Sequence, residues 1–94
     1  MIARPLNYRD RCLMGHRIAI LRIDSNQTQS VFGKKYGVNR LAVIRWENGV
    51  HIPRMIVLKQ MAKDYNTTVE WILYGEGEIH ERSPMDQTKS WNVR

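Results

Sequence analysis

Short apolar stripes at helical spacing, each followed by turn residues, constrain the fold of this chain more than any other feature. Met14, Ile18 and Leu21 recur four and three positions apart, which predicts an amphipathic helix over about residues 11–24. The polar run at 24–26 then ends this helix. No run of β-branched residues alternates with polar ones between hairpin turns, so the sequence predicts an all-α fold.

Four further helices are predicted from capping residues and glycine stops. Side chains of Thr and Asn accept hydrogen bonds from the first N–H groups of a helix, and glycine allows the left-handed turn that ends one. The expected N-caps are Thr28, Asn39 and Thr68, and Pro53 is expected in the first turn of the fourth helix. The expected stops are Gly37, Gly49 and Gly75. The second, third and fifth helices should cover about residues 28–36, 40–48 and 69–74, and the fourth should bury Leu58, Met61, Ala62 and Tyr65.

Two glycines in the middle of the chain predict a helix-turn-helix. Gly33 lies inside the second predicted helix, where glycine costs about 1 kcal/mol relative to alanine. Close approach of the following helix would explain such a small residue there. Gly37 supplies a positive φ for a tight turn through Val38 and Asn39. Two short helices joined in this way form a helix-turn-helix.

The third predicted helix presents two different faces at 100° per residue. Val43 and Trp46 fall on one side and should face the core. The opposite side carries Arg40, Leu41, Ile44, Arg45 and Asn48. Arginine is the commonest specific reader of guanine in the major groove, and apolar side chains meet thymine methyls there. The alternative for Leu41 and Ile44 is packing against another helix or tolerated exposure.

The charge of the chain favours a polyanionic partner. It carries a net charge of +6 and has a pI near 9.9. Residues 1–54 hold ten basic and three acidic residues, whereas residues 55–94 hold five and six. A basic half of this kind favours nucleic acid or an anionic membrane surface. No stretch approaches 18 apolar residues, so no membrane span is expected, and a single cysteine, Cys12, fits a reducing cytoplasmic setting.

The sequence predicts no catalytic residue, no metal site and no cofactor. Its histidines, His16, His51 and His80, are far apart, and one cysteine cannot complete a zinc site. No glycine-rich phosphate loop or nucleophile elbow is present. A chain of 94 residues also excludes a two-domain enzyme. We therefore expect neither an enzyme nor a small-molecule substrate.

Four segments resemble the helix-turn-helix family of phage repressors and Cro proteins, the XRE-like family. They are residues 15–22, then Thr28-Gln29 with Gly33 and Gly37-Val38, then residues 45–49, and residues 69–77. Together they cover about residues 13–78. The resemblance implies a compact five-helix domain of the lambda-repressor type. It also implies a sequence-specific transcription regulator that binds double-stranded DNA.

The same resemblance assigns roles to single residues. It implies base contacts for Arg40, Leu41 and Arg45, to which the outward face of the helix adds Ile44. It implies backbone contacts for Gln29 and Asn48 and a buried ion pair between Arg22 and Glu47. We add as expected backbone contacts Thr28, Lys34, Lys35 and Asn39. Three positions depart from the family pattern: Gln27 replaces an aliphatic core residue, Val31 a polar residue, and residues 65–67 a more apolar stretch.

The expected organisation is a flexible basic arm (1–12), the DNA-binding domain (13–78) and a polar tail or linker (79–94). One recognition helix reads few base pairs, so we expect a homodimer on an inverted repeat. The expected dimer surface lies around the fifth helix and the tail, because Trp71, Ile72, Leu73 and Tyr74 place more apolar groups there than a small core can bury. Two alternatives stay open: an antitoxin-type interaction module that also binds its own promoter, and a helical docking domain without DNA binding. A one-domain regulator and the DNA-binding half of a longer protein are both compatible with the sequence.

Overall fold

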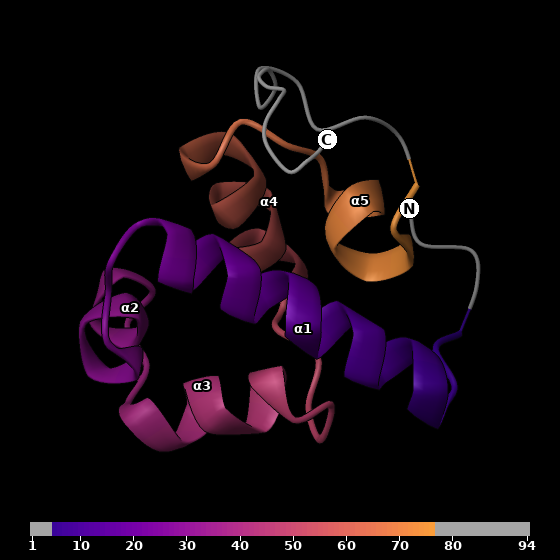
Figure 1. Ribbon diagram of the computed structural model, residues 1–94, viewed down its shortest axis with the longest axis horizontal. Coiled ribbons are helices and arrows are strands. Elements are labelled where there is room, and N and C mark those ends of the chain that lie inside the picture. The colour runs from indigo at the N-terminus through magenta and orange to yellow at the C-terminus, as the bar shows by residue number, and fades with distance from the viewer. Residues whose placement is uncertain (1–4, 77–94) are drawn as a thin grey trace.

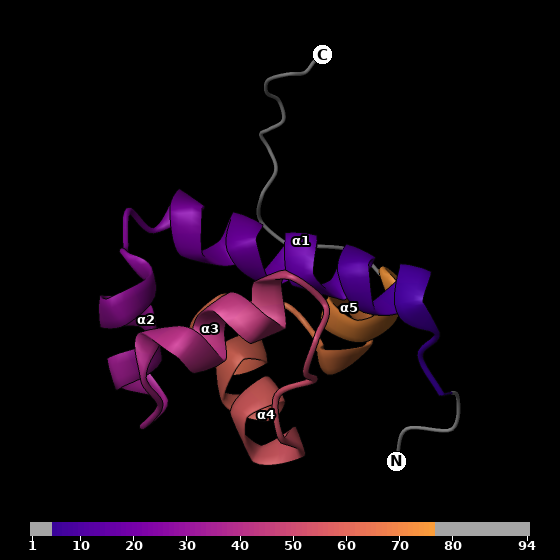
Figure 2. The same cartoon turned by 90° about the horizontal axis from the view of Figure 1, so that it is seen from below.

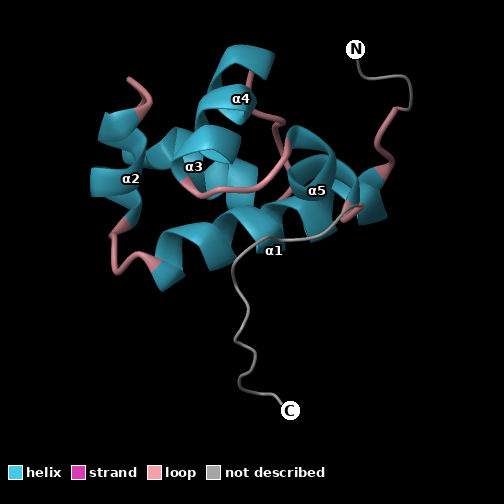
Figure 3. Ribbon diagram, turned by 90° about the horizontal axis from the view of Figure 1, so that it is seen from above, coloured by secondary structure: helices cyan, strands magenta, loops and turns pink. Residues whose placement is uncertain are grey.

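Five helices make up the part of the chain that can be described. The computed structural model describes residues 5–76, so residues 1–4 and 77–94, with the expected tail, lie outside the described residues. The helices are α1 (Tyr8–Asp24), α2 (Gln29–Lys35), α3 (Arg40–Glu47), α4 (Met55–Asp64) and α5 (Val69–Tyr74). Residues 5–76 contain no strand, as Figure 3 shows, and the expected all-α class is confirmed.

The helix α1 organises the others around it. In Figure 1 it crosses the molecule, with α3 on one side and α5 on the other. Each remaining helix packs on the helix that follows it in the chain: α2 packs on α3, and α4 packs on α5. Seen from below in Figure 2, α3 lies near the viewer and no other helix covers its outer side. Among residues 5–76, the fold thus leaves one side of α3 without a covering helix.

The predicted apolar stripes meet in a single core. The stripe of α1, Met14, Ile18 and Leu21, is almost completely buried, as is Phe32 of α2. The remaining core residues are Val43, Trp46, Leu58, Met61, Ala62, Ile72 and Leu73. Burial of apolar surface stabilises a fold by about 25 cal/mol for each Å² removed from water. This cluster is therefore the main stabilising contribution.

The first helix begins three residues earlier than the sequence pattern predicts. The side chain of Asn7 accepts a hydrogen bond from the Asp10 backbone N–H at 2.8 Å, which caps the helix at Tyr8. One turn later, Arg11 donates from Nε to the Gly49 carbonyl at 2.9 Å. Residues 8–12 are therefore helical, and Arg11 joins them to the turn after α3, which differs from the flexible arm expected there.

The other helix boundaries agree with prediction to within one or two residues. The side chains of Thr28, Asn39 and Thr68 each accept a bond from the backbone N–H three residues on, so the three predicted N-caps are confirmed. The exception is Pro53, which precedes the N-cap Arg54 and is not itself in the first turn of α4. Its ring is buried, so packing sets its place.

The apolar run at the end of α5 is not a surplus that needs a second subunit. Ile72 and Leu73 are 0% and 1% exposed, and Trp71 and Tyr74 are half-buried. The core is large enough to take these side chains because α5 packs on both α1 and α4. The reason given above for a dimer surface over 71–74 is therefore wrong.

Two helical glycines allow α3 to approach its neighbours closely. A Cβ on Gly33 would lie 2.8 Å from the Val38 carbonyl oxygen and 3.0 Å from Val43 Cγ2, which confirms the predicted close approach. A Cβ on Gly15 of α1 would meet the Glu47 carbonyl and lie 2.7 Å from the Trp46 carbonyl oxygen. Backbone atoms cannot rotate away, so glycine is required at both positions.

We expect Gly15→Ala to destabilise the domain, although alanine is the better helix former. The added methyl would press on the backbone of α3, and overpacking of this kind costs about 1–3 kcal/mol. A thermal melt should show a lower Tm than for the wild type. His16→Ala, at the exposed neighbouring position, is the control and should leave the Tm unchanged or slightly raised. A Gly15→Ala variant that melted no lower than the wild type would contradict the close crossing of α1 and α3.

Candidate nucleic-acid interface

The turn between α2 and α3 fixes the angle between the two helices. Gly37 has φ of +73° and follows the C-cap Tyr36. Its N–H donates to the Lys34 carbonyl at 3.2 Å, and the Val38 N–H donates to the Gly33 carbonyl at 2.9 Å. Asn39 then starts α3, with its Oδ1 accepting from the Ala42 N–H at 3.0 Å. The segment forms the helix-turn-helix predicted from the sequence.

The two faces of α3 separate as the helical wheel predicts. Val43 and Trp46 are 0% and 6% exposed and anchor the inner face in the core. On the outer face Leu41 is 47% exposed, which is high for a leucine. Around it the structure brings together the exposed side chains of Arg40, Arg45 and Asn48 and the half-buried Ile44. The result is an apolar strip flanked by two arginines on a helix with a fixed inner face.

The start of α2 lies beside this surface through its contact with the end of α3. Gln29, the first residue of α2, donates from Nε2 to Glu47 Oε1 at 3.1 Å. The preceding Thr28 uses its hydroxyl oxygen to cap the helix at the Val31 N–H, 3.1 Å away. Farther along the same helix, Lys34 is exposed. Of the expected backbone-contacting residues at and within α2, Thr28 caps the helix, Gln29 bonds Glu47 and Lys34 faces solvent.

Lys35 is tied to α4, which the sequence pattern does not indicate. Its Nζ donates to the Tyr65 hydroxyl at 3.1 Å and lies 4.8 Å from the centre of that ring. The Asp64 carboxylate is 4.0 Å away. These contacts place the ammonium group at the junction of α2 with the end of α4, and the expected contact of Lys35 with the DNA backbone stays a prediction.

The predicted ion pair between Arg22 and Glu47 is present. Arg22 Nε lies 2.6 Å from Glu47 Oε2, and Nη2 lies 3.1 Å from Oε1, so the contact is bidentate. The two side chains are only 16% and 9% exposed. Arg22 Nη1 also donates to the Gln27 carbonyl at 3.0 Å. One guanidinium thus joins α1, the α1–α2 connection and α3.

Two of the three departures from the family pattern contact each other. Gln27 Nε2 donates to the Tyr65 hydroxyl at 2.9 Å and to Ser25 Oγ at 2.7 Å. Where the family pattern has an aliphatic core residue, Gln27 thus makes a polar contact with a residue 38 positions away. Next to it, burial raises the pKa of Tyr36, and the hydrogen bond from its hydroxyl to Asp64 Oδ2 at 2.8 Å raises it further. Nothing in the sequence around Gln27 or Tyr65 indicates that these two side chains meet.

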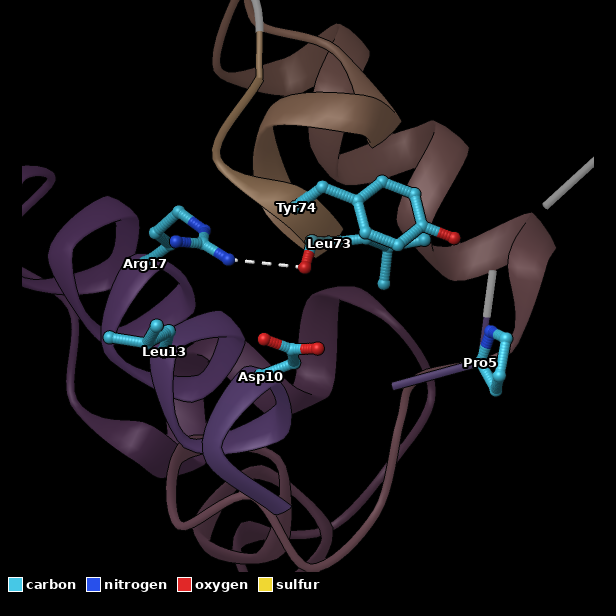
Figure 4. A pocket seen from close by; sticks show the side chains of 6 residues that line it. All are labelled: Pro5, Asp10, Leu13, Arg17, Leu73 and Tyr74. Atoms are coloured by element: carbon cyan, nitrogen blue, oxygen red, sulfur yellow. Dashed lines mark hydrogen bonds between the residues drawn. The ribbon is translucent and has the colours of Figure 1, made fainter. Parts of the chain in front are cut away.

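A small cavity lies between α1 and α5 (Figure 4). In Figure 1, α5 is on the opposite side of α1 from α3. The volume of the cavity is about 110 Å³, and its lining residues are Pro5, Asp10, Leu13, Arg17, Leu73 and Tyr74. Figure 4 shows Arg17 bonded to the Leu73 carbonyl, at 3.1 Å, and its Nε also donates to the Ile72 carbonyl at 2.9 Å. Burial lowers the pKa of Arg17, which the nearby Asp10 carboxylate opposes. The guanidinium therefore caps the end of α5 and belongs to the fold.

Within residues 5–76 no group of three or more His, Cys, Asp or Glu side chains could hold a metal ion. In that same part of the chain, no helix has the length and apolar character needed to cross a membrane.

Comparison with known families gives a match to the helix-turn-helix model over residues 18–72. This range covers more than half of the chain and contains both helices of the motif. The chain belongs to the helix-turn-helix family. The family consists of DNA-binding transcription regulators, so the chain carries the DNA-binding domain of such a regulator.

One curated relative is the HTH-type transcriptional activator BcrR of Enterococcus faecalis. It is 36% identical over 56 residues, which is 60% of this chain and 28% of the relative. The helix-turn-helix chain thus matches little more than a quarter of that protein.

Two solved structures are similar to the whole fold. The P22 c2 repressor, solved in complex with a synthetic operator, has a TM-score of 0.62 and 30% identity, over 68% of this chain and 97% of that one. The SOS-response repressor LexA from Eubacterium rectale has a TM-score of 0.65 and covers 100% of this chain and 96% of the other. At 17% identity the second likeness concerns the fold alone. The expected repressor-type fold is confirmed.

Proposed function

We propose that the domain is a non-catalytic, sequence-specific regulator that reads double-stranded DNA with the outer face of α3. The observation that carries the proposal is the combination of Arg40 and Arg45 with an exposed Leu41 on a helix whose other face is buried. Two arginines match guanine acceptors, and an exposed leucine on the same face matches a thymine methyl. Ile44, half-buried beside Leu41, completes the proposed base-facing set.

The proposed backbone contacts lie at the edges of that face. Gln29 and Thr28 flank it from the start of α2, Asn39 from the start of α3 and Asn48 from its end. Lys34 adds a charge that reads no sequence but increases affinity in a salt-dependent way. The likeness to the P22 c2 repressor bound to an operator supports this arrangement and a phage or prophage type of regulator. A DNA partner places the proposed site of action in the cytoplasm.

A homodimer on an inverted repeat is the proposed binding unit. The recognition helix has only eight residues, so one copy can reach only a few base pairs. Two copies related by a two-fold axis would read half-sites about one helical turn apart.

Selection of bound duplexes from a random pool tests both parts of the proposal. We expect an enriched inverted repeat whose half-site contains guanines. The selected duplex should also shift the sedimentation of the protein to that of a dimer on DNA. A pool without any enriched sequence would contradict sequence reading by α3. An enriched site without two-fold symmetry, bound by one copy, would contradict the dimer but would still agree with sequence reading by α3.

A further inference from the structure

The Arg22–Glu47 pair makes a contact that neither a core ion pair nor a DNA-reading helix requires. Glu47 Oε1 accepts from Arg22 Nη2 and also from Gln29 Nε2, each at 3.1 Å. We propose that Glu47 is a positioning residue for DNA binding, because its carboxylate holds the Gln29 amide ready for a backbone phosphate. The inference rests on the proposed function and assigns to Glu47 a task beyond stability.

The chemistry of the carboxylate fixes which way round the amide lies. An ionised carboxylate only accepts hydrogen bonds, so the Gln29 atom that faces it must be the amide nitrogen. A side-chain amide nitrogen carries two N–H groups. One of them is directed at Glu47, and the other is left to donate elsewhere. A phosphate oxygen, which is also only an acceptor, is a suitable partner for it.

The position of the carboxylate is itself fixed from two sides. The bidentate contact with Arg22 holds the plane of the Glu47 carboxylate. Arg22 also bonds the Gln27 carbonyl at 3.0 Å, two residues before Gln29. The start of α2 and the group that orients its first side chain are therefore held by one guanidinium.

Such an arrangement affects affinity through entropy. A glutamine side chain has several rotatable bonds, and ordering it on binding DNA would lower affinity. In this fold the ordering happens when the domain folds. Because a phosphate contact carries no sequence information, the gain should be the same for every duplex.

The test compares the effect of Gln29→Leu in two backgrounds. One background is the wild type, and the other is the Arg22→Met/Glu47→Leu double variant, in which an apolar pair replaces the ion pair so that folding is retained. In the wild type, Gln29→Leu should weaken binding to the selected operator and to a scrambled duplex alike, by about tenfold. In the double variant the same change should cost at least about threefold less.

A readout in the absence of DNA separates positioning from stability. The Gln29 side-chain amide proton that is directed at Glu47 should exchange more slowly in the wild type than in the Arg22→Met/Glu47→Leu variant. Gln60 is a matched control, because its Nε2 donates to the Asp64 carboxylate at 2.9 Å on α4, outside the proposed DNA-facing surface. Gln60→Leu should leave both affinities unchanged.

The possible outcomes distinguish the positioning role of Glu47 from the proposed DNA-binding function. Equal costs of Gln29→Leu in both backgrounds would overturn the positioning role while leaving sequence-specific binding in place. A wild type that bound neither the operator nor the scrambled duplex would overturn the proposed function and this inference together. A loss confined to the operator would show that Gln29 reads bases and would overturn its assignment to phosphate.

Discussion

Replacing Arg40 or Arg45 with alanine is expected to relax base preference at particular positions of the half-site while the domain stays folded. Both guanidinium groups stand on the outer face of α3, away from the core. A bidentate contact from arginine to guanine is worth about 1–3 kcal/mol of discrimination, which corresponds to roughly 5- to 150-fold. The measurement is a titration of each variant against the selected operator and a scrambled duplex at fixed salt.

Lys34→Ala is the control for the loss of a positive charge. Lys34 is exposed on α2 and can reach only phosphate in the proposed orientation, so its loss should weaken both duplexes by a similar factor and reduce the salt dependence. Lys35→Ala should behave differently, with a lower Tm, because its Nζ bonds the Tyr65 hydroxyl. Equal losses on both duplexes for the folded Arg40 and Arg45 variants would show that α3 does not read the sequence.

Glu47→Ala is expected to be the most destabilising substitution among the proposed site residues. It would leave the guanidinium of Arg22, which is only 16% exposed, without its carboxylate. Removal of one partner from a buried ion pair costs about 3–5 kcal/mol. A domain of this size loses roughly 4–8 °C in Tm for each kcal/mol, so a thermal melt should show a fall of more than about 10 °C.

The matched comparison is the Arg22→Met/Glu47→Leu variant. Replacement of both charges by apolar groups of similar size is often neutral or stabilising, because no unpaired charge remains. Its Tm should lie much closer to the wild type than that of Glu47→Ala. If both variants melted alike, loss of the ion pair would not be the cause of the instability. The packing of α3 on Gly15 would then be the alternative cause.

The contacts that the sequence-based description does not indicate share a cause. Arg11, Lys35 and Gln27 are long polar side chains whose partners lie 38, 30 and 38 residues away along the chain. Charge and periodicity indicate that such residues lie near the surface, but they do not indicate which carbonyl or hydroxyl group the fold will bring within 3 Å. The Arg22–Glu47 pair is predicted only through the family resemblance, which supplies the partner of Arg22.

The sequence by itself determined the helices, their caps and the division of α3 into a buried and an exposed face. These features depend on groups within four residues of one another, such as the Asn39 side chain and the Ala42 N–H, so local order contains the information. Tertiary structure alone decided that Arg11 bonds the Gly49 carbonyl in the turn after α3 and that the apolar end of α5 is buried. It also decided that Gln29 lies against Glu47. Contacts between distant segments depend on how the helices pack, and packing is settled only when all five helices share one core.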